Sequence, residues 1–257
     1  MRPVLFSTMG FELYAAPVFA GLAGLAAFLC FRSLMRRRGL APDELWSLVF
    51  LLAAGVVAGS YLFYALFYNG GPAGNLPFLL KYKRLPGGSF WGGFWTALVC
   101  AYIYCRAERI DFRRVADAVG LSAILALAVM RLGCFQHGCC YGTPTALRWG
   151  VVYTDPRCAV DGSLLGKALH PSQLYESLGC LAALLIIYLV FLKRERLKPG
   201  GAFVLAVVFY SMLRFAVDFF RGGDSGILQA GRLTTAQLIS LAGAAASVLW
   251  YRRAENL

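Results

Sequence analysis

The sequence predicts an all-α polytopic membrane protein built as one domain over residues 1–257, and three observations lead to this prediction. Hydrophobic residues make up 59% of the chain and charged residues 15%, whereas soluble domains are on average about 45–50% apolar. The mean hydropathy is +0.63. Seven separate apolar runs approach the ~20 residues that an α-helix needs to cross a bilayer. A disordered chain, a collagen-like repeat and a small disulfide scaffold are excluded.

The seven apolar runs are expected to form seven transmembrane helices, of which the third and fourth are the weakest. The first run is long and its cationic cluster follows it, so it is not expected to be a cleaved signal peptide. The expected helices span residues 12–31, 45–67, 89–105, 115–132, 172–192, 201–219 and 234–251.

The basic residues predict how the helices are oriented. Lysine and arginine concentrate after the first, third and fifth runs and in the C-terminal tail, and cytoplasmic segments retain such residues. The N-terminus is therefore expected outside and the C-terminus in the cytoplasm, with a small outer-face head formed by loops at about 68–88, 133–171 and 220–233. The residues that set this orientation are Arg32, Arg36, Arg37, Arg38, Arg106, Arg109, Arg113, Arg114, Lys193, Arg194, Arg196, Lys198, Arg252 and Arg253.

Cations on the outer side oppose the usual bias and need a local cause. Anionic phospholipid headgroups or a phosphate-bearing substrate supply one, while snorkelling at the interface explains Lys81, Lys83 and Arg84. The net charge of +12 is thus attributed to the membrane, with no nucleic acid as partner, and no nucleotide fingerprint indicates a cofactor. The remaining outer cations are Arg131, Arg148, Arg157, Lys167, Arg221 and Arg232.

Arg131 lies in the glycine-punctuated stretch Met130–Gly142, at the end of the fourth run. Glycines of this kind are expected to break the helix, and irregular backbone at membrane depth must line a cavity. Arginine beside such a cavity is a candidate for binding phosphate, because its planar fork offers two donors. Snorkelling to the interface is the structural alternative.

Arg214, Asp218 and Arg221 recur at i, i+4 and i+7 near the end of the sixth run and share one helix face. Asp218 can orient one arginine while the other stays free to bind an anion. A purely structural ion-pair network is the alternative.

The stretch from His170 to Glu176 is expected to begin a helix. Pro171 fixes the start, Ser172 is the expected N-cap, and Glu176 follows one turn later. His170 can act as a base, a metal ligand or a hydrogen-bonded strut, and the sequence slightly favours the strut.

Taken in this order, the motifs resemble those of the bacterial prolipoprotein diacylglyceryl transferases over most of the chain. The main matches are Arg131-Leu132-Gly133 with Gly138 and Tyr141-Gly142, then Trp149-Gly150-Val151-Val152, His170 to Glu176, and Arg214 to Arg221 followed by Asp224. Weaker matches are Gly59, Tyr64 to Tyr68, Gly92-Gly93, Gln237, Leu238 and Ser240.

The resemblance implies a seven-span enzyme of the bacterial inner membrane, with its active site toward the outer face. The family moves a diacylglyceryl group from phosphatidylglycerol to the lipobox cysteine of a prolipoprotein, forming a thioether and releasing glycerol phosphate. The resemblance implies catalytic roles for Arg131 and His170. The implied substrate-binding residues are Arg214, Arg221, Asp218, Gly142, Tyr175 and Glu176.

This sequence departs from the family pattern where the chemistry is expected. Trp91 stands in place of the family histidine in Phe90-Trp91-Gly92-Gly93, so the usual base is missing. In the Arg131 motif, Cys134 and His137 replace asparagines, Cys139 replaces a glutamate and Thr143 replaces an arginine. Tyr61 replaces a further arginine. The exchanges create a cluster of thiols and an imidazole: Cys134, His137, Cys139 and Cys140, with Cys158 and His170 later on the same side.

Four interpretations of this cluster stay open. His137 can replace the absent base, or Cys134 or Cys139 can be a nucleophile activated by His137 or Arg131 and serve a different acceptor. Thiolates with His137 or His170 can instead bind zinc or another soft metal, in the set Cys134, His137, Cys139 and Cys140. The structural alternative is a disulfide, for example from Cys158 to one member of the cluster.

The sequence therefore predicts a phospholipid-dependent transferase, with Arg131, Cys134, His137, Cys139 and His170 as its catalytic candidates. A membrane protein that binds lipid or metal without catalysis is the rival, and the loss of the family histidine is its main support. The rival ranks lower because an abandoned site has no need of costly intramembrane charges.

Overall fold

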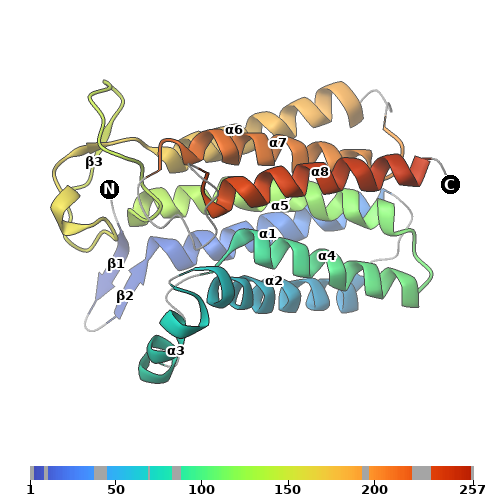
Figure 1. Cartoon of the computed structure of the whole chain (residues 1–257), viewed down its shortest axis with the longest axis horizontal. Coiled ribbons are helices and arrows are strands. Elements are labelled where there is room, and N and C mark those ends of the chain that lie inside the picture. Colours follow the sequence, from blue (N-terminus) through green and yellow to red (C-terminus); the bar gives the residue numbers. More distant parts are fainter. Residues whose placement is uncertain are drawn as a thin grey trace.

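The computed structural model describes residues 3–8, 11–37, 45–68, 70–82, 88–192, 197–221 and 233–255. Long helices run along a common axis and form an elongated bundle (Figure 1). Two short β-hairpins and the N-terminus lie at one end of the bundle, and the C-terminus lies at the other.

Each of the seven expected runs is a helix, within a few residues of its expected bounds. Five of the described helices, α1, α2, α5, α6 and α7, are long and apolar enough to cross a membrane. The helical membrane fold is thus confirmed. The long helices are α1 (Ala15–Arg36), α2 (Leu45–Phe67), α4 (Phe90–Ala107), α5 (Phe112–His137), α6 (Ser172–Ile186) with a π-helical continuation (Ile187–Leu192), α7 (Gly201–Asp218) and α8 (Thr235–Glu255).

The N-terminal boundary differs from the expected one because residues 12–14 are not helical. They belong to β2 (Phe11–Tyr14), which pairs antiparallel with β1 (Val4–Thr8), so α1 begins at Ala15. The first outer segment also differs, since it contains the helix α3 (Gly71–Tyr82) where a loop was expected.

The helix break expected within Met130–Gly142 is found, but it lies at Gly138 and not beside Arg131. α5 continues through Arg131 to His137 and ends only at Gly138, whose φ of +79° gives the left-handed turn that favours glycine. Gly133 instead allows α1 to approach, because a Cβ there would lie 2.4 Å from the Cβ of Phe19. Arg131 therefore projects from a regular helix, which fixes its position more firmly than a loop would.

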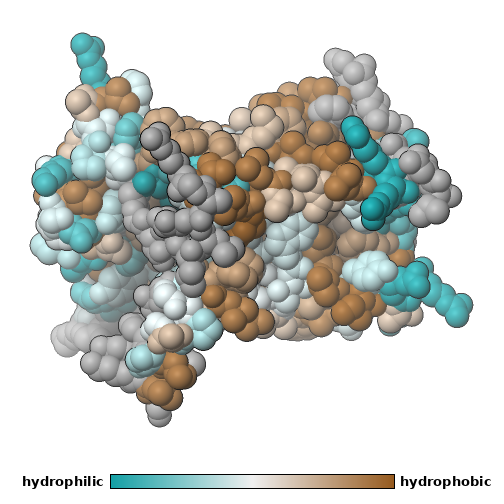
Figure 2. Space-filling model, in the orientation of Figure 1, coloured by the Kyte–Doolittle hydropathy of each residue, from teal (hydrophilic) through white to brown (hydrophobic). Residues whose placement is uncertain are grey.

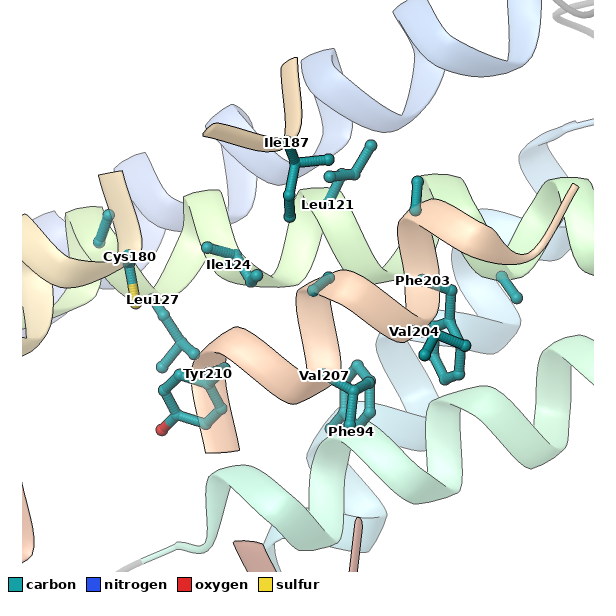
Figure 3. Close-up of a cluster of buried hydrophobic side chains, with 14 of the residues drawn as sticks. Phe94, Leu121, Ile124, Leu127, Cys180, Ile187, Phe203, Val204, Val207 and Tyr210 are labelled. Atoms are coloured by element: carbon teal, nitrogen blue, oxygen red, sulfur yellow. The ribbon is translucent and has the colours of Figure 1, made fainter. Parts of the chain in front are cut away.

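The core lies around α5, which packs against α1, α6 and α7. Figure 3 shows side chains from α4, α5, α6 and α7 directed toward one another at its centre. α2 and α4 approach at two glycines, since a Cβ at Gly92 would lie 2.5 Å from the carbonyl oxygen of Gly59. The core side chains labelled in the figure are Phe94, Leu121, Ile124, Leu127, Cys180, Ile187, Phe203, Val204, Val207 and Tyr210.

The connector between α5 and α6 forms a small head with its own core. β3 (Val151–Val152) pairs antiparallel with β4 (Ala168–Leu169), and a 3₁₀ turn (Gly162–Leu164) lies between them. Tyr153, Cys158, Val160 and Leu169 are buried together under this hairpin. Burial raises the pKa of the Tyr153 phenol to about 12. The head is thus a packed unit, although it is small.

The surface between the two ends is apolar. Hydrophobic residues form a band across the middle of the molecule, whereas hydrophilic side chains gather at both ends (Figure 2). Phe50 is 70% exposed, and Leu178 and Met212 are each 65% exposed. Apolar exposure on this scale is unfavourable in water and is what lipid-facing helices require.

Several expected cations fall outside the described residues. They are Arg38, Lys83, Arg84, Lys193, Arg194, Arg196 and Arg232, together with Asp224, and the side chain of Lys81 is likewise outside.

A buried carboxylate joins α5 to α7. Asp117 is 2% exposed and accepts hydrogen bonds from the backbone N–H groups of Gly200, at 3.0 Å, and Phe203, at 2.9 Å. The first N–H groups of a helix have no partner within it, so Asp117 satisfies two at the start of α7.

We predict that Asp117→Ala lowers the free energy of unfolding by about 2 kcal/mol or more, because two buried N–H groups lose their acceptor. Asp117→Asn, which keeps one acceptor oxygen, should cost less. The measurement is thermal unfolding in detergent, with Asp111→Ala as the control. Asp111 caps α5 at an exposed position through the N–H of Arg113, so its loss should cost about 1 kcal/mol. Equal effects of the two alanine variants would contradict the assignment.

Candidate active site

A fully buried carboxylate lies at the centre of the candidate site. Glu176 on α6 is 0% exposed, and its Oε1 accepts hydrogen bonds from Arg131 Nη2 and from the hydroxyl of Tyr210, each at 2.9 Å. Arg221 Nη1 lies 3.8 Å from Oε2. Three segments far apart in the sequence thus meet at one side chain: α5, α6 and the end of α7.

A second carboxylate holds the remaining arginine. Arg214 Nη1 lies 2.6 Å from Asp218 Oδ1, and Arg221 Nε lies 3.9 Å from the same oxygen. Thr234, just before α8, donates its hydroxyl hydrogen bond to Asp218 Oδ2. Asp218 therefore orients Arg214 on a shared helix face, in the arrangement that the sequence spacing predicts.

The cluster carries more positive than negative charge. Three guanidinium groups face two carboxylates, and the arginine side chains are only 11%, 12% and 21% exposed. Arg131 Nε is buried and has no hydrogen-bond partner among the described residues. Buried charge without a counter-charge is costly, so this arrangement can accept one anionic group. The three arginines are Arg131, Arg214 and Arg221.

Gly142 joins the head to the end of α7. Its N–H donates to the carbonyl of His170 at 3.0 Å, and the N–H of Thr143 donates to the carbonyl of Phe220 at 2.9 Å. A Cβ at Gly142 would lie 2.5 Å from the carbonyl oxygen of Phe220, so no larger residue fits without movement. The backbone of Gly142 also forms an isolated antiparallel β-bridge with the backbone of Arg221, which holds Arg221 next to the head.

His170 belongs to a chain of three hydrogen-bonding side chains. Trp149 Nε1 donates to the hydroxyl of Tyr175 at 2.8 Å, and this hydroxyl lies 3.2 Å from His170 Nδ1. Whether the Tyr175 hydroxyl donates to Nδ1 or accepts from it depends on which ring nitrogen of His170 carries the proton. The N–H of His170 also donates to the carbonyl of Thr143. These contacts agree with a hydrogen-bonded structural role for His170, the interpretation that the sequence slightly favours.

Three cysteines form a compact group beside Arg131. The sulfur atoms of Cys134, Cys139 and Cys140 all lie within 4.8 Å of one another, and we name them the cysteine turn. The left-handed Gly138 ends α5 and folds the chain back, which brings the last helical turn against the residues that follow it. Cys140 has a φ of +59°, an uncommon conformation for a residue with a side chain.

The cysteine turn lies in a positive environment. Arg131 Nη1 is 4.0 Å from Cys134 Sγ. Hydrogen bonds from the thiols of Cys134 and Cys139 hold the pKa of Cys140 well below its ordinary value, and Arg131 and Arg221 act in the same direction against the effect of burial.

His137 and Cys158 lie apart from the cysteine turn. The His137 ring packs edge-on against Tyr14 at 6.2 Å, and its Nδ1 is buried without a hydrogen-bond partner among the described residues. Neither His137 nor His170 belongs to the thiol group. All eight cysteines are free, so the alternative of a disulfide from Cys158 is not found in the structure. The metal set that includes His137 is likewise not assembled.

The start of α6 supports the cysteine turn. The expected N-cap role of Ser172 is wrong, because Pro171 occupies that position and the Ser172 hydroxyl donates instead to the carbonyl of Cys140 at 2.7 Å. Gln173 Nε2 donates to the carbonyl of Cys139 at 2.8 Å. Pro171 cannot cap with a side chain, which frees Ser172 and Gln173 for these contacts.

Sequence analysis missed two polar groups of the site. Tyr210 is buried in an apolar helix, and nothing in the sequence distinguishes it from a core aromatic residue. Thr234 forms a capping arrangement with Gln237, whose Oε1 accepts a hydrogen bond from the Thr234 N–H at 3.0 Å. A threonine followed three residues later by a glutamine is the sequence pattern of a capping box, so this helix start could have been predicted. Trp91 packs against Tyr210 with ring centroids 5.4 Å apart, next to the Glu176 cluster.

We predict that Glu176→Gln lowers the free energy of unfolding by about 3 kcal/mol, because the substitution leaves buried arginines without their counter-charge. Unfolding in detergent measures the effect, with Glu12→Gln as the control. Glu12 lies 3.9 Å from the half-exposed Arg157, so its loss should cost less than about 1 kcal/mol. A Glu176→Gln protein as stable as the control variant would show that the cluster does not hold the helices together.

Comparison with known proteins places these features in a family. The family model described as prolipoprotein diacylglyceryl transferase matches residues 3–252. A phosphatidylglycerol–prolipoprotein diacylglyceryl transferase of Clostridium tetani is 32% identical over 94% of this chain and 93% of its own length. Proteins with the same name from Geobacter sulfurreducens and Gloeobacter violaceus are 34% and 31% identical over 90% and 98% of this chain, and over 88% and 93% of their own lengths. This chain therefore belongs to the prolipoprotein diacylglyceryl transferase family.

Proposed function

We propose that this protein transfers the diacylglyceryl group of phosphatidylglycerol to a thiol acceptor, the lipobox cysteine of a prolipoprotein. Membership of the transferase family supports this function, as do relatives whose names give both substrates. The observation that carries the proposal is the excess positive charge of the buried arginine cluster. Three arginines and two carboxylates leave one charge for an anionic headgroup.

The proposed setting is the bacterial inner membrane, with seven spans and the active site toward the outer face. α4 and α8 run alongside the five apolar helices (Figure 1), which supports their assignment as the two further spans. α1, α4 and α8 all carry arginine in their last turns, which supports a cytoplasmic location for those ends. The arginine cluster and the head then lie on the outer side.

The proposed reaction is a displacement at the glyceryl carbon that carries the phosphate. The acceptor sulfur forms a C–S bond as the C–O bond to phosphate breaks, glycerol phosphate leaves, and the thiol proton passes to solvent. Arg131 is proposed as the catalytic cation on the leaving phosphate, with Arg214 and Arg221 binding the headgroup. Asp218 and Glu176 hold these arginines by the contacts described above, and Gly142 holds the connector.

The activation of the acceptor thiol must differ from a histidine-based scheme. Trp91 has no titratable group, and the contact of His137 with Tyr14 gives no support to His137 as the base. A thiol of pKa about 8.5 ionises more readily in a positive field, so we assign its activation to Arg131 and its neighbours. His170, held by Tyr175 and Trp149, is proposed to position the connector.

The cysteine turn favours a second candidate function. Cys134 lies 4.0 Å from Arg131 Nη1, so its thiol or that of Cys139 can attack the same glyceryl carbon and pass the group to a different acceptor. In this case the cysteine sulfur forms a C–S bond as the C–O bond to phosphate breaks, glycerol phosphate leaves, and the cysteine proton passes to solvent. The acceptor then attacks the same carbon as the C–S bond to the enzyme breaks, and the cysteine leaves as a thiolate that takes a proton from solvent.

We predict that the purified protein moves labelled diacylglyceryl from phosphatidylglycerol to a lipobox peptide, and that Arg131→Ala lowers the rate at least about 100-fold. Arg131→Ala also leaves Glu176 without this arginine, so Arg131→Lys is the more specific test. Lysine keeps the positive charge but lacks the two parallel donors of the guanidinium group, so this variant should fold and yet have strongly reduced activity. Arg157→Ala, in an exposed pair with Asp155, is the matched control and should be near wild type.

Four outcomes test the two candidate functions and the role of Arg131. Labelled peptide from the wild type with loss in Arg131→Lys supports the proposal. Label on Cys134 or Cys139 of the protein itself, without peptide product, supports the second candidate. Folded protein that binds phosphatidylglycerol but transfers no label would leave a binding role, and an Arg131→Lys rate equal to that of Arg157→Ala would refute the assignment of Arg131.

A further inference from the structure

The cysteine turn presents a donor set that the proposed transfer reaction does not require. Cys134, Cys139 and Cys140 are each partly buried and free, and their sulfur atoms lie within 4.8 Å of one another. Among the described residues these three are the whole of the ligand group, with no histidine or carboxylate in it. Three convergent sulfur donors are the ligand type that soft metal ions select.

The spacing suits a three-coordinate ion. Metal–sulfur bonds of about 2.3 Å in a planar trigonal site place the sulfur atoms about 4 Å apart. Thiols already within 4.8 Å of one another reach that separation by small side-chain rotations, without movement of the backbone. Zinc prefers four ligands in a tetrahedron, and the group supplies three. The donor number therefore favours copper(I) over zinc.

The surroundings hold the donors in place. The carbonyls of Cys139 and Cys140 are fixed by hydrogen bonds from Gln173 Nε2 and the Ser172 hydroxyl, at 2.8 and 2.7 Å. The left-handed conformations of Gly138 and Cys140 fold the chain so that the third sulfur turns back toward the other two. Hydrogen bonds to ligand-bearing residues, such as these, keep metal ligands in a fixed orientation.

The local charge also favours a metal–thiolate complex. A copper(I) ion with three thiolates carries a net charge of about −2. Arg131 Nη1 lies 4.0 Å from Cys134 Sγ, and the arginine cluster has a positive charge in excess. These cations stabilise an anionic complex beside them, whereas such a complex would be unfavourable at an apolar site.

We propose that Cys134, Cys139 and Cys140 form a binding site for a single soft metal ion, and that copper(I) fits this site best. On binding, each S–H proton is released to solvent as a Cu–S bond forms, and no electron is transferred. The sulfur donors differ from the arginines proposed to bind the phospholipid, although Arg131 lies beside both. The metal site is proposed whether or not the protein transfers diacylglyceryl groups.

The test is a copper(I) titration of the purified full-length protein in detergent, reduced with a phosphine and kept free of oxygen, against a chromophoric copper(I) chelator. We expect one equivalent per chain to be held. Cys134→Ser, Cys139→Ser and Cys140→Ser should each weaken binding about 100-fold or more. The matched controls are Cys100→Ser, within α4, and Cys158→Ser, in the core of the head, and both should bind as the wild type does. A parallel zinc titration should show weaker binding.

A second measurement uses only the wild-type protein and so does not depend on a variant that folds. Bound copper(I) should protect Cys134, Cys139 and Cys140 from alkylation, as read by peptide mass spectrometry, while Cys100 should react at the same rate with and without copper. Absence of a chelator-resistant equivalent in the wild type would overturn the proposal. So would wild-type affinity in all three turn variants, or equal protection of Cys100.

Discussion

The structure depends on the neutralisation of Glu176, a carboxylate with no solvent contact inside a helical bundle that faces lipid. An isolated ion at such a place is strongly unfavourable, so Arg131, Tyr210 and Arg221 must meet it from other segments. Glu176 lies on α6, Arg131 on α5 and Tyr210 on α7, and Arg221 follows the end of α7. This one group of contacts therefore fixes the relative positions of three helices. The apolar core below it supplies the packing, but apolar contact between helices in lipid is not directional in the way that ion pairs are.

The same interaction sets what the site can bind. Two carboxylates hold three arginines in place and leave one positive charge in excess, which makes a preorganised positive site beneath a small head. Gly142 and the hydrogen-bonded chain of Trp149, Tyr175 and His170 fasten that head to the end of the bundle. The cysteine turn then adds thiols within reach of the same field. The fold, the proposed anion binding and the proposed thiol chemistry thus all depend on one buried group of charges.

Much of the fold followed from the sequence, because lipid imposes long apolar runs that composition reveals. All seven expected runs are helical, and the i, i+4, i+7 spacing of Arg214, Asp218 and Arg221 placed these residues on one face. Local backbone was harder to predict. Gly133 serves close packing with Phe19 and Gly138 ends the helix, a distinction that only the neighbouring helix decides. The role of Tyr210 and the separation of His137 from the thiols depend on tertiary contacts, which no local pattern records.

The central claim is that the buried arginine cluster binds an anionic phospholipid headgroup. The most direct measurement is the unfolding temperature of the detergent-purified protein with phosphatidylglycerol and, separately, with phosphatidylcholine of identical acyl chains. Phosphatidylglycerol at about 100 times its dissociation constant should add about 2.7 kcal/mol to the free energy of unfolding, and phosphatidylcholine should add much less. Arg214→Gln should abolish that difference between the two lipids. Equal stabilisation of the wild type by both lipids would contradict the account, because the charge of the cluster would then have no part in binding.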